Sequence, residues 1–380
     1  MTGWRTVQLG TALELAYGRA LPKSVRAEGG GVPVYGSNGV AGSHNEVLVD
    51  GPTVIVGRKG SAGAVHYVDG SCYPIDTTYF VRARPGFEFD MKFLFYLLRK
   101  LDLSRLKTAT GVPGLTREDA YRESIPVPPL DEQRRIVDLL SRAEGIVRLR
   151  REAQKKAQTI IPALFIDMFG DPATNPKGWT MESFGKVGAL DRGRSRHRPR
   201  DAAELYGGPY PFIQTGDVAN SGGRITRHAV TYSEAGLEQS RLWPSGTLCI
   251  TIAANIAKTG ILDFQACFPD SVVGFLPGDG VTTAYVQGWL SFLQPTLEAN
   301  APQAAQKNIN LEILRALPVP MPPINLQRAF EPRCDAVRSI QLQQADAARR
   351  AEVTFKSLIA HAFSEGPQQE TRRAERMAIA

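Results

Sequence analysis

The sequence PPLDEQRRIVDLL, which begins at Pro128, returns as PPINLQRAFEPRC at Pro322, 194 positions later (322 − 128). The same separation still holds at the far end of both segments, where Phe169 corresponds to Phe363. Surface loops tolerate insertions at little cost, so a long repeat without a gap indicates that the length of the segment matters. We therefore predict two matched, rigid elements of about 40 residues each.

Both copies carry residues at alternating steps of three and four, which is the spacing of a coiled-coil seam. In the first copy the predicted seam runs through Ile136, Leu139, Ala143, Ile146, Arg150, Ala153, Ala157, Ile160 and Leu164. In the second, more polar copy it runs through Phe330, Arg333, Val337, Ile340, Gln344, Ala347, Ala351, Thr354 and Leu358. Each helix would be roughly 60 Å long at 1.5 Å per residue. We predict that the two pack as one antiparallel coiled coil and act as a ruler, with Pro162 kinking or loosening the first helix.

The repeat extends beyond the helices. Gly3-Trp4 and Gly178-Trp179 begin matching units, 175 positions apart (179 − 4), and an apolar, strand-like stretch follows each tryptophan. Further on, strand-like runs such as 53–56 and 247–250 correspond, while their separation drifts because loop lengths differ. The pattern predicts two copies of a β-rich domain, each leading into a long helix, and one further amphipathic helix over 91–101.

Composition is that of a globular protein, with 380 residues, 43% hydrophobic and 22% charged. No apolar run approaches the roughly 18 residues that cross a bilayer, and the N-terminus lacks the pattern of a secretory signal, so we expect a cytoplasmic protein. The four cysteines lie far apart and are expected to be buried, reduced thiols. A net charge of +7 is compatible with a polyanionic partner.

Three motifs carry a family resemblance. They are IPVPPLDEQ at 125–133, FGDP at 169–172 followed by NPKGW at 175–179, and AQKNIN at 305–310. With the repeat, they make the chain resemble, up to about Phe363, the specificity subunit of type I restriction–modification systems. The second copy departs from the first in having Leu326 where the first has Glu132.

The resemblance implies an α+β fold with two β-rich target-recognition domains separated by two long antiparallel helices that form a coiled coil. We expect recognition domain 1 at 1–127, the first spacer helix at 128–169, a linker at 170–177, recognition domain 2 at 178–319, the second spacer helix at 320–364 and a disordered tail at 365–380.

The resemblance also implies partners. Each domain would read one half of a split site in double-stranded DNA, and the helices would fix the spacer and dock two methyltransferase subunits. Those subunits, not this chain, would bind S-adenosylmethionine, and motor–nuclease subunits would join. Exposed helix residues are the candidates for the protein contacts, among them Glu132, Arg135, Glu144, Arg148 and Arg151. Independently of the resemblance, two related heads on a rigid spacer suit a ligand with two spaced sites, such as half-sites about one DNA turn apart.

Candidate DNA contacts in the first domain lie in three loops. The turn from Gly57 to Gly63 follows an apolar run and offers charge, backbone access and bidentate donors for guanine. The segment YGSNG and the loop before the long helix offer further hydrogen-bonding side chains; a plain β-turn with solvated side chains is the alternative for each. The candidates are Tyr35, Ser37, Asn38, Arg58, Lys59, Ser61, Lys107, Thr108 and Thr110.

The second domain offers counterparts. IQTGD matches YGSNG, the segment from Ala253 to Gly260 matches the glycine-rich turn, and QAAQKNIN precedes the second helix. The basic run from Arg192 to Arg200 favours phosphate contact over a solvated loop, because no acid interrupts it. The candidates are Arg194, Arg196, Arg198, Gln214, Thr215, Asp217, Asn255, Lys258, Gln306, Lys307 and Asn308.

Signatures of catalysis are missing from the sequence. It contains no Walker A motif, no cofactor-binding glycine loop and no (N/D/S)PP(Y/F) motif of an amino-methyltransferase, and no metal site is expected. We therefore favour a non-catalytic DNA reader. Two alternatives stay open: a single-chain methyltransferase or nuclease, and a coiled-coil scaffold that binds only protein and shows no salt-dependent, sequence-selective DNA affinity.

Overall fold

The computed structural model describes residues 4–108, 113–197, 199–253, 256–299 and 309–363. The chain forms two compact units. Unit 1 combines residues 1–152 with 346–380, and unit 2 comprises residues 153–345. The long C-terminal helix α10 (Ile324–Ala362) contributes residues to both units.

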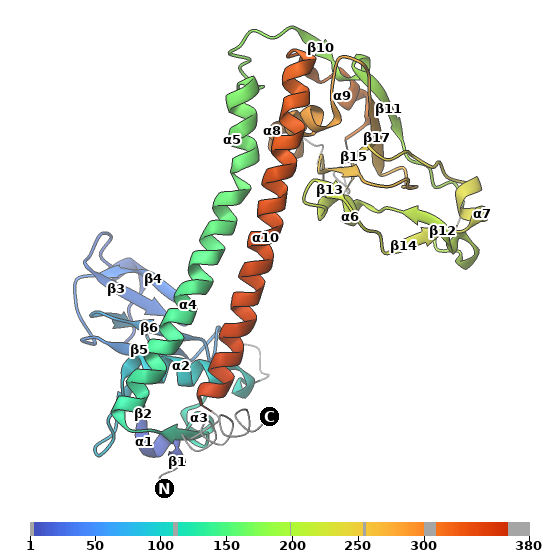
Figure 1. Ribbon diagram of the computed structural model, residues 1–380. Helices are drawn as coiled ribbons and strands as arrows, with labels where there is room; N and C mark the ends of the chain where they lie inside the picture. The colour runs from blue at the N-terminus through green and yellow to red at the C-terminus, as the bar shows by residue number, and fades with distance from the viewer. Residues whose placement is uncertain (1–3, 109–112, 198, 254–255, 300–308, 364–380) are drawn as a thin grey trace, which may run out of the picture. The chain divides into compact units, whose positions relative to one another are not determined.

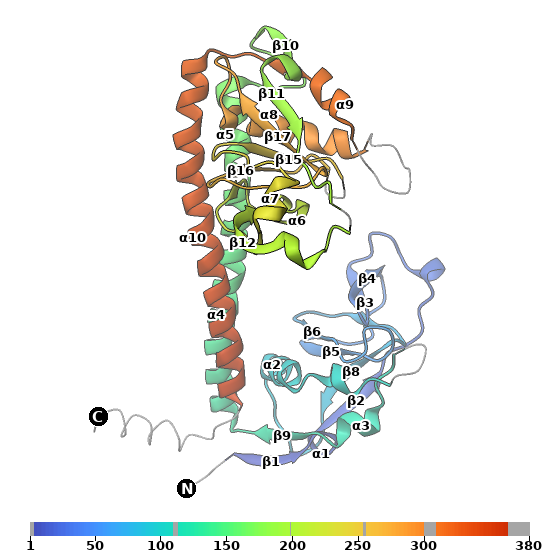
Figure 2. The same ribbon diagram turned by 90° about the vertical axis from the view of Figure 1, so that its right-hand side faces the viewer.

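Unit 1 is built on a four-stranded antiparallel sheet in the order β2-β8-β5-β6. Its strands are β2 (Leu13–Tyr17), β8 (Thr78–Ala83), β5 (Thr53–Gly57) and β6 (Val65–Val68). All five residues of β5 are buried, as expected for the β-branched centre of a sheet. Helix α2 (Met91–Leu101), whose N-terminus is capped by the Asp90 side chain, lies between this sheet and α4 (Leu130–Gln158) (Figure 2).

A second, three-stranded sheet completes the β-rich part of unit 1. Its order is β4-β3-β7, with β3 (Val32–Gly36) antiparallel to β4 (Gly39–His44) and parallel to β7 (Tyr73–Pro74). The chain enters through β1 (Arg5–Gln8) and leaves through β9 (Ser124–Val127), which pair antiparallel immediately before α4. The short helices of this unit are α1 (Leu9–Ala12), η1 (Lys23–Val25), η2 (Leu103–Leu106) and α3 (Arg117–Tyr121).

Unit 2 repeats this plan and extends it. Its five-stranded sheet has the order β11-β17-β15-β16-β13, with strands β11 (Gly188–Arg192), β17 (Val272–Pro277), β15 (Leu248–Thr251), β16 (Thr259–Leu262) and β13 (Arg224–Ile225). The first four occupy the places of β2, β8, β5 and β6, and β13 is an addition that pairs parallel with β16. Helix α8 (Thr283–Ala299) takes the place of α2 and packs against α5 (Ile160–Phe169), where the Phe165 and Tyr285 rings stack 5.6 Å apart (Figure 1).

Three of the remaining elements of unit 2 also have counterparts in unit 1. Strands β10 (Met181–Ser183) and β18 (Pro318–Pro320) pair like β1 and β9, and α9 (Leu311–Ala316) matches α3. The other elements are β12 (Tyr206–Phe212), β14 (Val230–Tyr232), α6 (Thr215–Ala219), α7 (Glu234–Glu238), η3 (Phe184–Lys186) and η4 (Ala203–Leu205). The predicted duplication of a β-rich domain is thus confirmed in the strand order, and the helix predicted over 91–101 is α2. We call the β-rich parts head 1 (residues 4–127) and head 2 (residues 178–319).

The predicted seam of the first copy is right at Ile136 and Ala157, which are buried, and wrong at exposed positions such as Arg150. Leu139, Ile146 and Ile160 are 43%, 52% and 42% exposed, whereas Leu140 and Val147 are buried. In the second copy the buried residues are likewise one step further along the helix, with Cys334 and Phe355 in place of Arg333 and Thr354. The error arises because the first copy has apolar neighbours at 139/140, 146/147 and 160/161, so the 3/4 pattern fits two phases equally well.

The helices pack antiparallel within each unit. In unit 1, Ile136 and Val147 of α4 share a core with Phe355 of α10 and with Phe363, which directly follows α10. Arg151 of α4 also pairs with Glu352 of α10 at 2.7 Å. The buried contact between α4 and α10 in unit 1 therefore runs through residues such as Leu140 and Val147.

The first helix is interrupted at Thr159, between α4 and α5. Pro162 has no N–H to donate to the carbonyl of Gln158, which explains why the regular helix ends there. Gln341 of α10 donates its side-chain amide to the Ala157 carbonyl beside the break, at 2.8 Å. The predicted effect of Pro162 is therefore confirmed, although the interruption lies one turn before the proline.

All four cysteines are buried, as predicted. Among the residues that the structure describes, no helix is both long and apolar enough to span a membrane.

Candidate nucleic-acid interface

A buried glutamine attaches each head to the helix that follows it. Gln133 is 1% exposed and donates its amide to the carbonyls of Glu88 and Pro128, both at 3.0 Å, while its oxygen accepts the Asp90 N–H at 2.9 Å. Each polar atom of this side chain thus has a partner, which is what burial requires. The position of each head on the first turn of its helix depends on this joint.

Gln327 makes the equivalent bonds in unit 2. Its amide donates to the carbonyls of Gly280 at 3.0 Å and Pro322 at 2.9 Å, and its oxygen accepts the Thr282 N–H at 2.9 Å. The two joints share one geometry.

Further along the helices, the heads are held by different side chains. In unit 1, Glu144 of α4 accepts hydrogen bonds from Tyr96 and Arg99, each at 2.8 Å. The matching position in unit 2, 194 residues later (338 − 144), is Arg338, which donates to Gln287 at 2.5 Å. The predicted protein-contact residue Glu144 therefore serves to hold head 1.

Arg224 adds a second attachment in unit 2. It forms ion pairs with Asp263 at 2.7 Å, with Asp335 of α10 at 3.2 Å and with Glu331 of α10 at 3.5 Å. Burial alone would lower the pKa of Arg224, but the hydrogen bonds that it donates to Asp263 and Asp335 raise it, so the guanidinium stays charged. The added strand β13, which contains Arg224, is thereby tied to α10.

The structure brings two predicted contact loops of head 1 together. The turn between β5 and β6 and the loop before α3 are joined by backbone bonds, from Leu115 N–H to the Arg58 carbonyl at 2.9 Å and from Gly60 N–H to the Pro113 carbonyl at 3.0 Å. Lys59 in the turn and Lys107 in the loop are both exposed. We call this surface the rim of head 1; it comprises Tyr17, Arg58, Lys59, Ser61, Lys107, Thr108 and Arg117.

Two rim residues were not predicted from the sequence. Tyr17, at the end of β2, is 48% exposed and lies under two guanidinium groups, that of Arg58 at 4.9 Å and that of Arg117 at 4.4 Å from the ring centre. Burial, and secondarily the neighbouring Tyr17, raises the pKa of Tyr79 to about 12, although Arg58 and Arg117 oppose this shift. The sequence gives no signal for this grouping, because Tyr17 and Arg117 lie far apart in the chain and are brought together by long-range contacts. Among these contacts are the pairing of β2 with β8 and the hydrogen bond from the Leu15 N–H to the Tyr121 hydroxyl.

The YGSNG segment offers fewer contact groups than its sequence suggests. Ser37 is buried, and its hydroxyl donates to the Thr77 carbonyl at 2.5 Å. Burial raises the pKa of the half-buried Tyr35 phenol above its ordinary value. Asn38 is exposed at the tip of the hairpin. Of the three predicted residues, Asn38 presents its polar group most openly.

The predicted contacts on α6 of head 2 are partly used by the fold. Gln214 is exposed, and Thr215 begins α6. The Asp217 carboxylate accepts the Gln214 N–H at 2.8 Å and thus caps this short helix. On the hairpin that matches the glycine-rich turn, Lys258 is exposed.

The basic run of head 2 is held by its backbone. Gln239 accepts the N–H groups of Arg196 at 2.6 Å and His197 at 3.1 Å, and Ser240 donates to the Arg194 carbonyl at 2.9 Å. Arg194 and Arg196 are exposed. Arg194 and Arg196 therefore extend from a backbone that is held in place by side-chain hydrogen bonds.

Six predicted contacts lie outside the described residues. They are Thr110, Arg198, Asn255, Gln306, Lys307 and Asn308.

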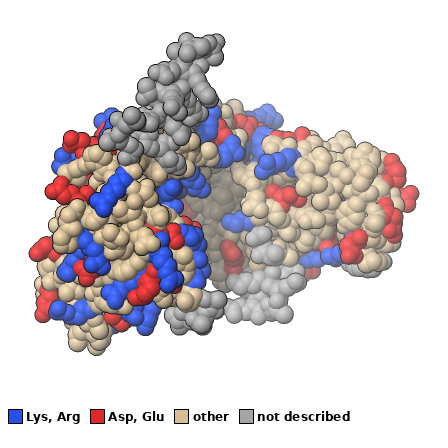
Figure 3. Space-filling model, turned by 90° about the horizontal axis from the view of Figure 1, so that it is seen from below, with Lys and Arg blue, Asp and Glu red and all other residues tan. Residues whose placement is uncertain are grey.

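Charge on the surface is mixed. Figure 3 shows lysine and arginine side chains interspersed with acidic ones over the face that it presents. Within the described parts of the chain, no group of three or more metal-ligating side chains is present. Contact with a polyanion would therefore depend on local clusters such as the rim of head 1.

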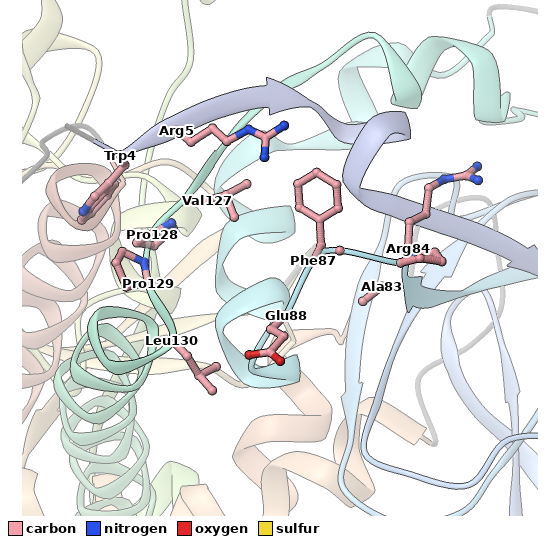
Figure 4. Close-up of a pocket in the computed structure, with 12 residues that line it drawn as sticks. Trp4, Arg5, Ala83, Arg84, Phe87, Glu88, Val127, Pro128, Pro129 and Leu130 are labelled. Carbon is pink, nitrogen blue, oxygen red and sulfur yellow. The ribbon is translucent and has the colours of Figure 1, made fainter. Parts of the chain in front are cut away.

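A concavity of unit 1 with a volume of about 960 Å³ lies where β1 and β9 lead into α4 (Figure 4). It is lined by aromatic, proline and arginine side chains, and Arg5 lies over the Phe87 ring at 5.2 Å. Glu88 is the single carboxylate of the lining. Such a lining provides neither a paired acid and base nor an activated nucleophile.

Comparison with known proteins places these features in context. The sequence profile described as "Type I restriction modification DNA specificity domain" matches residues 1–158 and again 176–330. The putative type I restriction enzyme MjaX specificity subunit of Methanocaldococcus jannaschii is 23% identical over 64% of this chain and 60% of its own length. The Escherichia coli type I restriction enzyme EcoprrI specificity subunit is 25% identical over 32% of this chain and 30% of its own length. The matches thus span less than two thirds of either relative.

Two solved structures share the fold. The S subunit of the type I restriction–modification system from M. genitalium has a TM-score of 0.62 at 13% identity, over 95% of this chain and 96% of its own. A chain from a study of complex assembly and conformational transition in a type I system has a TM-score of 0.61 at 20% identity, over 96% of this chain and 98% of its own.

Proposed function

Because the chain belongs to the type I restriction–modification DNA-specificity family, we propose that it is the DNA-reading subunit of such a system, with one head for each half of a bipartite duplex site. This role is non-catalytic. The observation that carries the proposal is the duplication itself, in which two heads with one strand order are attached by the same glutamine joint to matched helices. A ligand that such a chain fits has two related sites at a fixed separation.

Each head would read base edges and hold phosphates through different groups. The rim of head 1 offers guanidinium and ammonium groups, which suit guanine edges and phosphates. Head 2 offers the basic run, the α6 side chains and Lys258. The predicted contacts outside the described residues stay part of this proposal.

The two long helices would form the spacer. We propose that α4, α5 and α10 together form one antiparallel coiled coil, with the domain limits given above. Deleting seven residues from each helix should then shorten the spacer of the recognised site, measured by methylation mapping. An unchanged spacer would refute the proposal that the length of the helices sets the distance between the half-sites.

Two methyltransferase subunits would dock on the outside of the helices. Leu139, Ile146 and Leu149 of α4 are 43%, 52% and 58% exposed, an apolar series that a solvated helix does not need. Ion pairs such as that of Glu132 with Arg135, at 2.8 Å, flank it. The methyltransferase would bring S-adenosylmethionine and flip the target adenine, and motor–nuclease subunits would complete a restriction complex.

Methylation mapping tests the proposal directly. The chain is co-expressed with the methyltransferase subunit of its own system, and genomic methylation is read by long-read sequencing with and without the chain. We expect a split, asymmetric motif with a constant spacer that appears only when the chain is present. Methylation without the chain would favour an independent methyltransferase. A chain that binds the subunit without affecting methylation or selective DNA affinity would be a protein scaffold.

A further inference from the structure

A Gly-Arg pair stands at the same structural position in each head. Gly18-Arg19 directly follows β2, and Gly193-Arg194 directly follows β11, 175 positions later (193 − 18). In head 1 the N–H groups of Gly18 and Arg19 donate to the carbonyls of Thr78 at 3.1 Å and Pro74 at 3.0 Å. Both backbone N–H groups of the pair in head 1 are thus engaged by the backbone of a neighbouring segment.

Head 2 repeats the same two bonds. The N–H groups of Gly193 and Arg194 donate to the carbonyls of Val272 at 2.9 Å and Phe268 at 3.1 Å. The backbone of both arginines is thus held by hydrogen bonds to a neighbouring segment of its own head.

The fold explains the glycine of each pair. A Cβ atom on Gly18 would lie 2.1 Å from the Ile75 carbonyl oxygen, and one on Gly193 would lie 2.2 Å from the Phe268 carbonyl oxygen. No side chain fits at either place without moving the backbone.

The fold does not explain the arginine. Arg19 and Arg194 are both exposed, and within the described residues neither side chain makes a hydrogen bond, ion pair or ring contact. Their side chains contribute nothing that folding would require, yet both heads have arginine at this position.

The residues around the pair have changed between the heads. Tyr17 corresponds to Arg192, while Arg58 and Arg117 correspond to Ile252 and Leu311. The equivalence is structural, because the Ile309 N–H donates to the Ile252 carbonyl at 3.0 Å just as Leu115 does to Arg58. Base-reading residues must differ between half-sites of different sequence, whereas the phosphate backbone is the same in both.

We propose that Arg19 and Arg194 are equivalent phosphate contacts, one on each head, that fix where the head sits on DNA without reading sequence. The inference rests on the function proposed above. In each head, the shared arginine would position the DNA, and the surrounding residues, which differ between the heads, would determine the sequence that is read.

The test uses the full-length chain in complex with its methyltransferase subunit and two duplexes, one with the mapped motif and one with the motif scrambled. Dissociation constants are measured by fluorescence anisotropy between roughly 50 and 200 mM salt, for wild type, R19A, R194A and R19A/R194A. Losing one phosphate contact should reduce the slope of log K against log salt by about 0.9, and losing both by about 1.8. Each single variant should weaken binding to both duplexes by the same factor.

Charge-preserving and matched variants complete the design. R19K and R194K should keep most of the slope. R82A and K186A remove exposed cations elsewhere on the two heads and should leave the slope unchanged. Unfolding midpoints of the Arg19 and Arg194 variants should match wild type, since neither arginine is packed.

Two results would overturn the inference while leaving the proposed function intact. Wild-type slopes in R19A and R194A would show that these side chains do not touch phosphate. A weakening confined to the mapped motif, with altered bases in the methylated site, would show base reading instead. If wild type itself failed to distinguish the two duplexes, the proposed function would fall and this inference with it.

Discussion

Head 1 and head 2 share their strand order but have side chains of different charge and polarity at equivalent positions. At the rim, head 1 has an exposed tyrosine between Arg58 and Arg117, whereas head 2 has Arg192 beside the apolar positions Ile252 and Leu311. On the helices, the carboxylate of Glu144 in unit 1 is replaced by the guanidinium of Arg338 in unit 2. The lesson is that backbone hydrogen bonds preserve the common frame, while side chains on that frame have diverged freely.

The glutamine joints are the exception to this divergence. Removing the side chain in Q133A or Q327A leaves two carbonyls and one N–H without partners in a buried place, at about 1–3 kcal/mol for each group that stays unsatisfied. We expect both variants to destabilise their own unit by about 3 kcal/mol, and by similar amounts. Hydrogen exchange of backbone amides in each unit measures the two effects separately.

Q158A is the matched control, because Gln158 is an exposed residue at the end of the same helix as Gln133. It should change stability by less than about 0.5 kcal/mol. If Q133A and Q327A lowered the free energy of unfolding of their units by clearly different amounts, the two joints would not be equivalent.

The side-chain attachments should differ in strength. Arg224 is 30% exposed and serves three carboxylates, so R224A should cost unit 2 about 1–2 kcal/mol. Arg99 and Glu144 form a more exposed pair, and R99A should cost unit 1 less than about 1 kcal/mol. Urea unfolding followed by probes in each unit provides the measurement, and R224K, which keeps the charge but not the fork of donors, should recover part of the loss. Equal costs for R99A and R224A would contradict a stronger attachment in unit 2.

The smallest expected effect lies on the helices, where Gly145 of α4 corresponds to Ser339 of α10 (339 − 145 = 194). A Cβ on Gly145 would meet nothing within 4 Å. G145A should therefore stabilise unit 1 by about 0.5–1 kcal/mol through helix propensity alone, and S339A should stabilise unit 2 by less. Thermal unfolding of the two variants measures this difference, and destabilisation by G145A would indicate a close contact at that position.

Local patterns allowed much of the fold to be predicted. The gapless repeat indicated the duplication, the apolar run at 53–56 became β5, and the amphipathic pattern at 91–101 became α2. The phase of the helix seam could not be decided, because adjacent apolar residues such as Leu139 and Leu140 fit either phase. Burial of one rather than the other depends on packing that a single helix does not encode.

The candidate site could be predicted only loop by loop. Sequence reasoning found the Arg58–Lys59 turn and the Lys107–Thr108 loop, but their meeting at one rim follows from long-range backbone bonds. The same bonds bring in Arg117, which lies at the start of a helix with no distinctive motif. In contrast, Ser37 and Asp217 have the right chemistry for DNA contact, yet hydrogen bonds within the fold engage them.

The glutamine joint has a consequence for how such a chain can change over time. Gln133 and Gln327 bond only to main-chain groups of the heads, at Glu88 and Asp90 in one case and Gly280 and Thr282 in the other. The joint therefore depends on the backbone conformation of a loop and on no side chain of that loop. A head can drift in sequence, or be replaced by a foreign one with the same loop, and keep this joint, while side-chain contacts such as that of Arg99 with Glu144 would change. New DNA preferences of a head can therefore arise without compensating substitutions at the glutamine joint.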